Sequence, residues 1–257
     1  MSAPSLVRIE DLLAAFKLPT LARELVPRMR EAGLDDALPT LLEILELEAG
    51  DRRERRVARL RRASRLPPGK TFDTFRMKRL PPALARQIAD LARGEFLERA
   101  ANVLAFGLPG RGKSHVACAI GHALVERGRS VLFAPAYELV QELLLAKREL
   151  RLPRALARLD LFELVILDDI GYVKQTPEEA EILFTLMAER YERRSLLITS
   201  NLVFSQWDQI FANPMATAAA IDRVVHHSVI LEFGVESYRS EEALARMPAA
   251  APSETPA

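Results

Sequence analysis

The sequence holds a single cysteine, Cys118, and lacks any long apolar run. One cysteine cannot form a disulfide within the chain, which agrees with a reducing cytoplasm. No apolar run approaches the roughly 18 residues that a membrane-spanning helix needs. The first residues also lack the basic segment followed by an apolar one that marks a secretory signal. These absences lead us to expect a cytoplasmic protein with no membrane span. Cys118, set among alanines, is expected to be a small buried hydrophobe rather than a nucleophile.

An excess of charge of one sign is missing as well. The 36 Lys and Arg residues nearly balance the 35 Asp and Glu residues, so net charge indicates no class of partner. The content of 49% apolar and 28% charged residues is usual for a globular protein. A chain of 257 residues suffices for one large domain, or for a main domain with a small appendage.

The chain divides into three regions that differ in composition and residue pattern. Residues 1–66 are expected to form a small helical N-terminal domain, because leucines recur there at helical spacing. The run Leu66-Pro67-Pro68-Gly69 would break the second helix and act as a linker. Residues 67–246 form the expected main domain, and the Ala- and Pro-rich residues 247–257 are expected to be a disordered tail.

In the main domain, short apolar runs alternate with longer amphipathic stretches. Such alternation predicts an α/β fold with a central parallel sheet that helices cover on both faces. The predicted strands are residues 103–106, 131–134, 164–167, 196–199 and 229–233. Thr176, followed by Pro177 and Glu179, predicts the capped start of a helix, and Ser205 is a second candidate cap.

One run of eight residues matches the phosphate-binding pattern G-x-x-x-x-G-K-[ST]. It reads Gly107-Leu108-Pro109-Gly110-Arg111-Gly112-Lys113-Ser114. The glycines let the loop curl so that backbone N–H groups point at phosphate oxygens. Lys113 would bind the β- and γ-phosphates of ATP, and the Ser114 hydroxyl would ligate Mg²⁺. The motif follows an apolar strand and opens a helix whose dipole favours an anion, so a chance match in a glycine-rich turn is the weaker interpretation.

Two aspartates follow the predicted strand 164–167. Asp168 and Asp169 would lie at its carboxyl end, where open α/β sheets bind ligands. Asp168 would hold Mg²⁺ through water, and Asp169 would act as the general base toward the attacking water. Two acids at a strand end are commonly a solvated turn, but about fifty residues after a P-loop they indicate a magnesium site.

The predicted strand 196–199 also ends in polar residues, Thr199, Ser200 and Asn201. In a P-loop ATPase a polar residue at this place contacts the γ-phosphate and the attacking water, and Asn201 is the candidate. Without the other motifs, an ordinary transition from strand to turn explains these residues equally well.

Two arginines near the end of the chain are candidates for contacts to phosphate. Arg223 would be an arginine finger that acts on a nucleotide held by the next subunit. Arg239 is a second phosphate-sensing candidate, with a plain surface arginine as an equal alternative. His226 and His227 suggest a metal site, but adjacent helical residues point in different directions and no third ligand is visible in the sequence. We therefore interpret both histidines as structural.

Together these motifs resemble the IstB-type transposition helper ATPases, which belong to the AAA+ class and are close to the DnaC-type helicase loaders. The resemblance covers most of the chain, including Phe72 and Phe75 ahead of the ATPase core. It rests on the P-loop and on Asp168–Tyr172, Thr199–Asn201, Asp222-Arg223 and Ser237-Tyr238-Arg239. Asp169 departs from the AAA+ pattern, in which glutamate is usual, and this leaves the rate of hydrolysis open.

The resemblance implies binding and hydrolysis of ATP with Mg²⁺, assembly of copies into a ring or filament on double-stranded DNA, and help to a transposase in selecting or capturing its target. Two helical stretches carry basic residues that would neutralise phosphates, and in the first stretch these residues recur at a spacing of three to four. They contain Arg52, Arg55 or Arg56, Arg59 and Arg62, and then Lys147, Arg148, Arg151 and Arg154. A solvated helix face is the usual alternative. No aromatic residues interleave with these charges, which predicts contact with the DNA backbone and no sequence readout.

Three other functions stay open on the sequence alone. A DnaC-like helicase loader would use the same ATPase core with a different protein partner. A kinase for a small metabolite would need a substrate pocket and a mobile lid that carries arginine, which fits the helical N-terminal region and Arg223 less well. A nucleotide-gated binding protein with little catalysis is compatible with Asp169.

Overall fold

The computed structural model describes residues 3–171, 175–211 and 214–234. The chain forms two compact units, Met1–Arg59 and Leu60–Ala257. The division falls within one long helix, α3 (Leu38–Ala63). Among the described residues, no helix combines the length and the apolar character that crossing a membrane requires.

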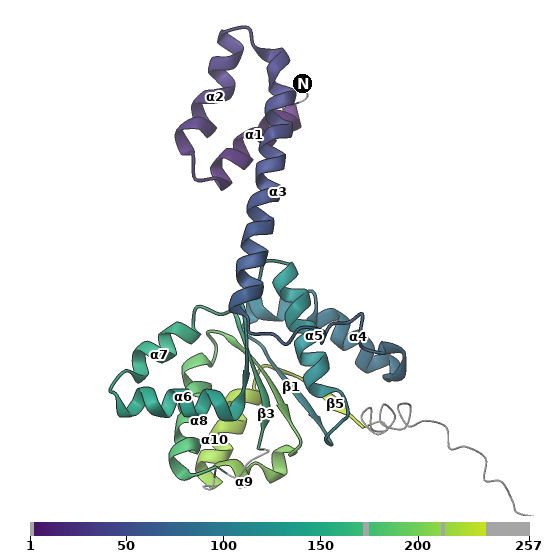
Figure 1. The fold of residues 1–257 in the computed structure, drawn as a ribbon, viewed down its shortest axis with the longest axis vertical. Coiled ribbons are helices and arrows are strands. Elements are labelled where there is room, and N and C mark those ends of the chain that lie inside the picture. The colour runs from purple at the N-terminus through teal and green to yellow at the C-terminus, as the bar shows by residue number, and fades with distance from the viewer. Residues whose placement is uncertain (1–2, 172–174, 212–213, 235–257) are drawn as a thin grey trace, which may run out of the picture. The chain divides into compact units, whose positions relative to one another are not determined.

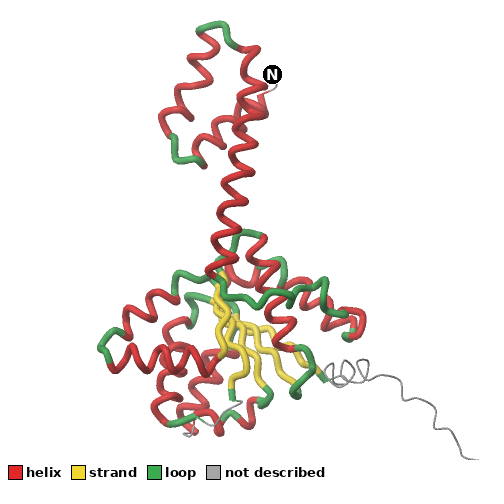
Figure 2. The backbone as a smooth tube through the Cα atoms, viewed as in Figure 1, coloured by secondary structure: helices red, strands yellow, loops and turns green. Residues whose placement is uncertain are grey.

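The first unit is helical, as predicted. Its core consists of Ile9, Leu13, Val26 and Leu38, around which further leucines pack. The chain turns between the first two helices at Lys17, whose φ of 61° is a left-handed conformation that no helix continues. The elements are α1 (Ala3–Ala15), α2 (Pro19–Glu31), a 3₁₀ turn η1 (Asp35–Ala37) and the first part of α3, all visible in Figures 1 and 2.

The second unit is built on a five-stranded parallel sheet with the strand order β2-β3-β4-β1-β5. This confirms the predicted α/β fold (Figure 2). Each predicted strand is present, and β3 continues past residue 167 so that Asp168 and Asp169 belong to it. The strands are β1 (Asn102–Gly107), β2 (Val131–Pro135), β3 (Leu164–Ile170), β4 (Ser195–Ser200) and β5 (Ser228–Phe233).

Helices cover both faces of this sheet. Successive side chains of a strand point to opposite faces, so these apolar strands present apolar side chains on both faces. One face, which includes Leu104 and Leu196, packs in a single core with residues of α6, α8 and α10. On the other face α5 approaches so closely that Gly121 lies against Ile166. The main helices are α4 (Pro82–Leu91), α5 (Lys113–Glu126), α6 (Ala136–Arg148), α7 (Leu152–Leu159), α8 (Pro177–Arg190) and α10 (Pro214–Val225). Shorter turns are η2 (Met77–Arg79), η3 (Glu95–Arg99), η4 (Phe204–Gln206) and α9 (Asp208–Phe211).

The two predicted helix caps have different outcomes. Thr176 caps α8: its hydroxyl accepts from the Glu179 backbone N–H at 3.3 Å, and the Glu179 carboxylate accepts from the Thr176 N–H at 2.7 Å. The prediction for Ser205 is wrong, because Ser205 lies inside the 3₁₀ turn η4 and α9 starts only at Asp208.

The strand order places β4 between the strand of the P-loop and the strand of the two aspartates. Ser200 of β4 pairs with Phe106 of β1 on one side and with Ile170 of β3 on the other. Neighbouring strands lie about 4.8 Å apart, so the carboxyl ends of β1 and β3 are about 10 Å apart with β4 between them. The loops that leave these strands therefore lie close together at the carboxyl end of the sheet.

Candidate nucleotide-binding site

The loop after β1 has a conformation that requires glycine at two positions. A Cβ on Gly107, with φ of 150°, would lie 2.5 Å from the carbonyl oxygen of Phe233 in β5. A Cβ on Gly112, with φ of 90°, would lie 2.8 Å from Cε2 of Phe75. Both glycines are therefore fixed by close approach as well as by backbone conformation. The loop that they shape leads into α5 at Lys113.

Positive groups line the inside of this loop. The Lys113 side chain is buried, and its Nζ donates to the carbonyl oxygens of Gly107 at 2.6 Å and Leu108 at 3.0 Å. Gly112 caps α5 without a side-chain hydrogen bond, and the first turn of α5 carries no acid. The first N–H groups of the helix are thus oriented for an anion. Nη1 of Arg111 is buried and has no hydrogen-bond partner among the residues that the structure describes. These features fit a chain of phosphates.

A segment ahead of β1 packs against the start of α5. The ring of Phe75 lies 5.0 Å from the ring of His115, centroid to centroid. His115 Nε2 lies 3.0 Å from the carbonyl oxygen of Thr71 and 3.1 Å from Oγ1 of Thr74. Because Phe75 also touches Gly112, this segment fixes the P-loop from outside. Sequence reasoning singled out Phe75 but missed His115, and its position two residues after Lys113 was the only signal.

Thr199 joins the two halves of the acidic motif. Its buried hydroxyl donates to Oδ1 of Asp168 at 2.7 Å and accepts from the backbone N–H of Asp169 at 2.8 Å. The pairing of β3 with β4 shifts register between Leu167 and Ile170. Asp169 lies in this shift with φ of 61°, a conformation that aspartate tolerates better than most residues. Asp168 is therefore buried and fixed, whereas Asp169 is exposed at the edge of the sheet.

The other two polar residues at the end of β4, Ser200 and Asn201, have different surroundings. Ser200 is buried, and its hydroxyl donates to the carbonyl oxygen of Ile170 and accepts from the N–H of Leu202, both at 3.0 Å. Asn201 is half-buried, and its side chain makes no hydrogen bond with any described residue. Ser200 thus holds the strand ends together, and Asn201 is the polar side chain left for a ligand.

The oxygen groups of this edge suit a magnesium ion. Ser114 supplies a hydroxyl at the start of α5, and Asp168 supplies a carboxylate at the end of β3. Mg²⁺ is a hard cation that prefers oxygen ligands and keeps several of its waters. Cys118, one turn further along α5, is fully buried, and burial raises the pKa of its thiol to about 12. It is therefore neither a metal ligand nor a nucleophile.

Arg223 lies at the opposite end of the sheet from the P-loop of its own chain. The side-chain amide of Asn102, the first residue of β1, donates to the carbonyl oxygen of Val224 at 3.1 Å. Gly107 ends the same strand five residues later, about 16 Å away at 3.3 Å per residue. The Arg223 guanidinium lies 4.9 Å from the centre of the Phe184 ring and donates to the carbonyl oxygen of Ala219. The other candidate, Arg239, lies outside the described residues.

The basic residues of α3 are partly engaged within the chain. Arg52 bonds the Glu48 carboxylate at 2.5 Å, and its guanidinium lies 4.1 Å from the centre of the Phe16 ring. Arg55 reaches the same carboxylate at 3.4 Å. Arg59 and Arg62 are exposed and have no ion-pair partner among the described residues. Positive charge without an acidic partner among the described residues therefore lies in the last two turns of this helix.

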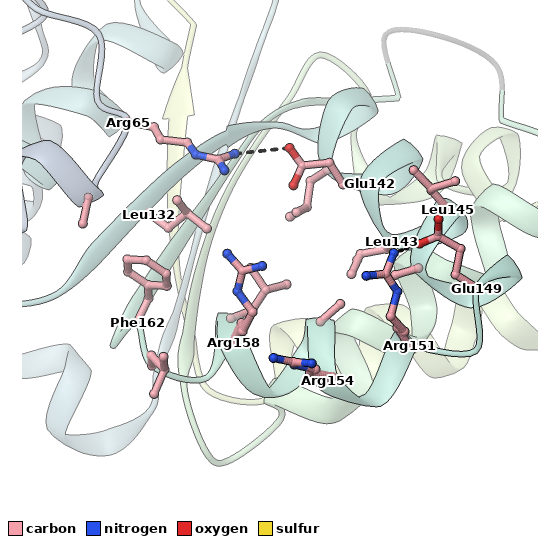
Figure 3. A pocket seen from close by; sticks show the side chains of 16 residues that line it. Arg65, Leu132, Glu142, Leu143, Leu145, Glu149, Arg151, Arg154, Arg158 and Phe162 are labelled. Atoms are coloured by element: carbon pink, nitrogen blue, oxygen red, sulfur yellow. Dashed lines mark hydrogen bonds and ion pairs between the residues drawn. The ribbon is translucent and has the colours of Figure 1, made fainter.

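A second basic surface surrounds a cavity of about 780 Å³ beside the edge strand β2, lined by α6, α7 and the residues after α3 (Figure 3). Its floor is apolar and contains Leu132, Leu143 and Phe162. Four arginines border it: Arg65, Arg151, Arg154 and Arg158.

Only some of these basic residues are free to bind a ligand. Arg65 pairs with Glu142 at 3.2 Å and Arg151 pairs with Glu149, as the dashed lines in Figure 3 show. Arg154 and Arg158 have no ion-pair partner in the part of the chain that the structure describes. Sequence reasoning missed Arg158, although its spacing of four from Arg154 on α7 was a signal.

The two basic residues predicted on α6, Lys147 and Arg148, both pair with acids of α8. Lys147 Nζ lies 2.8 Å from the Glu181 carboxylate, and Arg148 lies 4.0 Å from that of Glu178. In the structure, the basic residues of this region without an acidic partner among the described residues therefore lie on α7 and not on α6.

Comparison with known proteins gives a family and a fold. The family described as IstB-like ATP binding protein matches residues 12–245. A Sinorhizobium fredii protein named as an insertion sequence ATP-binding protein is 44% identical over 241 residues, which span 92% of this chain and 80% of the relative. An IS21 ATP-binding protein of Pseudomonas aeruginosa is 35% identical over 236 residues, spanning 91% and 89%.

Solved structures resemble this chain at lower identity. The DnaC helicase loader matches with a TM-score of 0.54 at 18% identity, covering 64% of this chain and 96% of the loader. AMPPCP-bound DnaA from Aquifex aeolicus matches with a TM-score of 0.56 at 16% identity, covering 71% and 56%. At such identities the likeness shows the fold alone, an α/β core with a parallel sheet.

Proposed function

The chain belongs to the IstB-like ATP binding protein family, and on that premise we propose that it binds and hydrolyses ATP with Mg²⁺ and assists a transposase on DNA. The observation that carries the nucleotide site is the place of β4. It brings the Thr199 hydroxyl, bonded to Asp168, between the P-loop of β1 and the acids of β3. A triphosphate bound by the P-loop and a metal ion held by Ser114 and Asp168 would lie together at the carboxyl end of the sheet.

Each residue of this edge has a distinct role in the proposal. The P-loop residues Gly107, Leu108, Pro109, Gly110, Arg111, Gly112, Lys113 and Ser114 would bind the phosphates. Ser114 and Asp168 would hold Mg²⁺, which neutralises charge on the phosphate oxygens when bound. Asp169 would accept a proton from the attacking water, since it is the exposed carboxylate of the pair. The Asn201 amide would orient that water.

A complete site would need two copies of the chain. Arg223 lies at the opposite end of β1 from its own P-loop, which supports a role at the nucleotide of a neighbouring copy. Stacked copies would bring the Arg223 of one to the γ-phosphate of the next, where a supplied arginine is worth about 10³–10⁵ in rate. This supports assembly into a ring or filament when ATP is bound. Arg239, the second arginine candidate, would sense the phosphate.

Double-stranded DNA is the proposed template for this assembly. Arg154 and Arg158 on α7 and Arg59 and Arg62 on α3 are basic residues without acidic partners among those described. Such charges bind the phosphates of DNA whatever the base sequence. A helical N-terminal domain that contacts DNA or a partner completes the proposed organisation, and the tail predicted at residues 247–257 lies outside the described residues. The proposed compartment is the cytoplasm.

The transposase role rests on relatives that are named for insertion sequences, and the alternative is a DnaC-like helicase loader. A strand-transfer reaction separates the two: a transposase of the insertion-sequence type is given target DNA with ATP, with and without the protein. We expect more insertion, and altered insertion sites, when the protein is present. Unchanged insertion together with faster loading of a replicative helicase would establish the loader instead.

A further inference from the structure

Three side chains with metal-ligand chemistry gather at the end of the sheet away from the P-loop. Ligand atoms of Glu192, His226 and His227 all lie within 4.8 Å of one another, and the three side chains are exposed. Glu192 lies between α8 and β4, and the histidines lie between α10 and β5. The cluster therefore joins two turns that are far apart in the sequence.

The two sequence arguments against a metal at the histidines do not hold in the structure. Helix α10 ends at Val225, so His226 and His227 lie in a turn and not on a helix. Their rings are 4.3 Å apart, centroid to centroid, at an interplanar angle of 66°. The third ligand, Glu192, is 34 residues away in sequence from His226, which is why the sequence did not reveal it.

Both turns are anchored in the fold. The His227 carbonyl oxygen accepts from the N–H of Asn102 at 2.7 Å, which ties that turn to the first residue of β1. On the other side, the buried Arg190 donates to the carbonyl oxygen of Ser195 at 3.0 Å and closes the turn that contains Glu192. Glu192 has φ of 56°, a strained conformation for glutamate. Strain of this kind persists where the surrounding structure enforces it, and it often marks a ligand site.

One histidine also has a partner that would orient it. The Tyr191 hydroxyl lies 3.3 Å from Nδ1 of His226. Histidines that bind metal usually bond their other ring nitrogen to a neighbouring group, which fixes the ring. With Nδ1 held in this way, Nε2 of His226 is the nitrogen available to a metal.

We propose that Glu192, His226 and His227 bind a divalent transition-metal ion, with Zn²⁺ as the best match. Two imidazole nitrogens and one carboxylate oxygen form a ligand set that suits zinc, with open positions for water. Tetrahedral zinc with bonds of about 2.0–2.1 Å needs ligands about 3.4 Å apart, so the exposed side chains, whose ligand atoms lie within 4.8 Å of one another, would have to rotate toward the ion. The hard oxygen groups of Ser114 and Asp168 at the other edge favour magnesium instead.

A bound ion would fasten the end of α10 to the turn before β4. Arg223 lies three residues before His226, in the last turn of α10. The metal would thus restrain the part of the chain that carries this arginine, and it would raise the stability of the folded state by binding to it alone.

The test is a zinc titration of untagged, nucleotide-free protein, with excess Mg²⁺ present to occupy the oxygen site. We expect one Zn²⁺ per chain by calorimetry and a higher midpoint of thermal unfolding. The double variant His226→Gln/His227→Gln should lose both effects, whereas the control His122→Gln, remote in sequence and bonded to the Pro67 carbonyl, should keep them. Zinc binding that survives in the double variant, or none in the parent, would overturn the proposal. If the double variant does not fold, Glu192→Gln decides: the affinity must fall by at least about tenfold.

Discussion

Thr199 Oγ1 lies 2.7 Å from Oδ1 of Asp168, and this one hydrogen bond connects the central strand β4 to the carboxylate of β3 that we propose as a magnesium ligand. The same hydroxyl accepts from the N–H of Asp169. A hydroxyl that donates to one acid and accepts from the backbone of the next fixes the position of both. The geometry of the acidic motif therefore depends on a residue of another strand.

Replacing Thr199 should damage hydrolysis more than ATP binding. Thr199→Val keeps the shape of the side chain but leaves a buried carboxylate oxygen and a backbone N–H without this partner, at a cost of about 1–3 kcal/mol each. We expect a lower free energy of unfolding in urea and slower phosphate release. Thr199→Ser keeps the hydroxyl and should resemble the parent. Equal turnover of Thr199→Val and parent would show that the hydrogen bond does not position the acids.

Asp169 offers a pair of variants that separates backbone strain from chemistry. Asp169→Asn should leave the free energy of unfolding nearly unchanged, because asparagine tolerates a φ of 61° as aspartate does. Asp169→Ala should cost about 1 kcal/mol, because alanine does not. Both variants should keep ATP bound and stop hydrolysis, since neither has a carboxylate to accept a proton. If Asp169→Asn still releases phosphate at the parental rate, the general base lies elsewhere.

Much of the candidate nucleotide site could be predicted from the sequence because the motifs that form it are local. The P-loop, the five strands and the acids at the end of β3 are each encoded in a few adjacent residues. Other features depend on contacts between distant segments, which a single sequence does not reveal. His115 against Phe75, and Glu192 beside His226, are of this kind.

The basic residues show the same limit. Lys147 and Arg148 are as basic in sequence as Arg154, but only the fold shows that acids of α8 neutralise the first two. Likewise, the extension of β3 past Leu167 depends on the pairing of Asp168 with Pro135 of β2 and of Ile170 with Ser200 of β4, which the apolar run alone did not indicate.

DNA binding should depend on α7 more than on α6. The double variant Arg154→Ala/Arg158→Ala should weaken binding to all duplex sequences alike and reduce the salt slope of the affinity by about 2, one for each phosphate contact. The matched control Lys147→Ala/Arg148→Ala removes the same charge from residues that face acids of α8, and should have a smaller effect. A parental salt slope in Arg154→Ala/Arg158→Ala would show that α7 is a solvated surface, and an equal decrease in both double variants would show that α7 contributes no more than α6.

Arg223 should act on the nucleotide of a neighbouring copy. Arg223→Ala should bind ATP normally and lose most of its hydrolysis, while losing about 1 kcal/mol or less of stability with the contact to Phe184. Mixing it with inactive Lys113→Ala should restore part of the activity, because some junctions then combine an intact Lys113 with an intact Arg223. A mixture that co-assembles and stays inactive would confine Arg223 to its own subunit or to a structural role.

The central claim is that ATP is hydrolysed in the cradle between the P-loop and Asp168, and phosphate release tests it most directly. The parent protein should release phosphate from ATP with Mg²⁺, lose this activity with EDTA, and work faster on duplex DNA. Lys113→Ala should bind ATP at least about tenfold more weakly, since it loses a charge-assisted contact with the phosphates, and should release no phosphate. Parental affinity and parental turnover in Lys113→Ala would contradict the account.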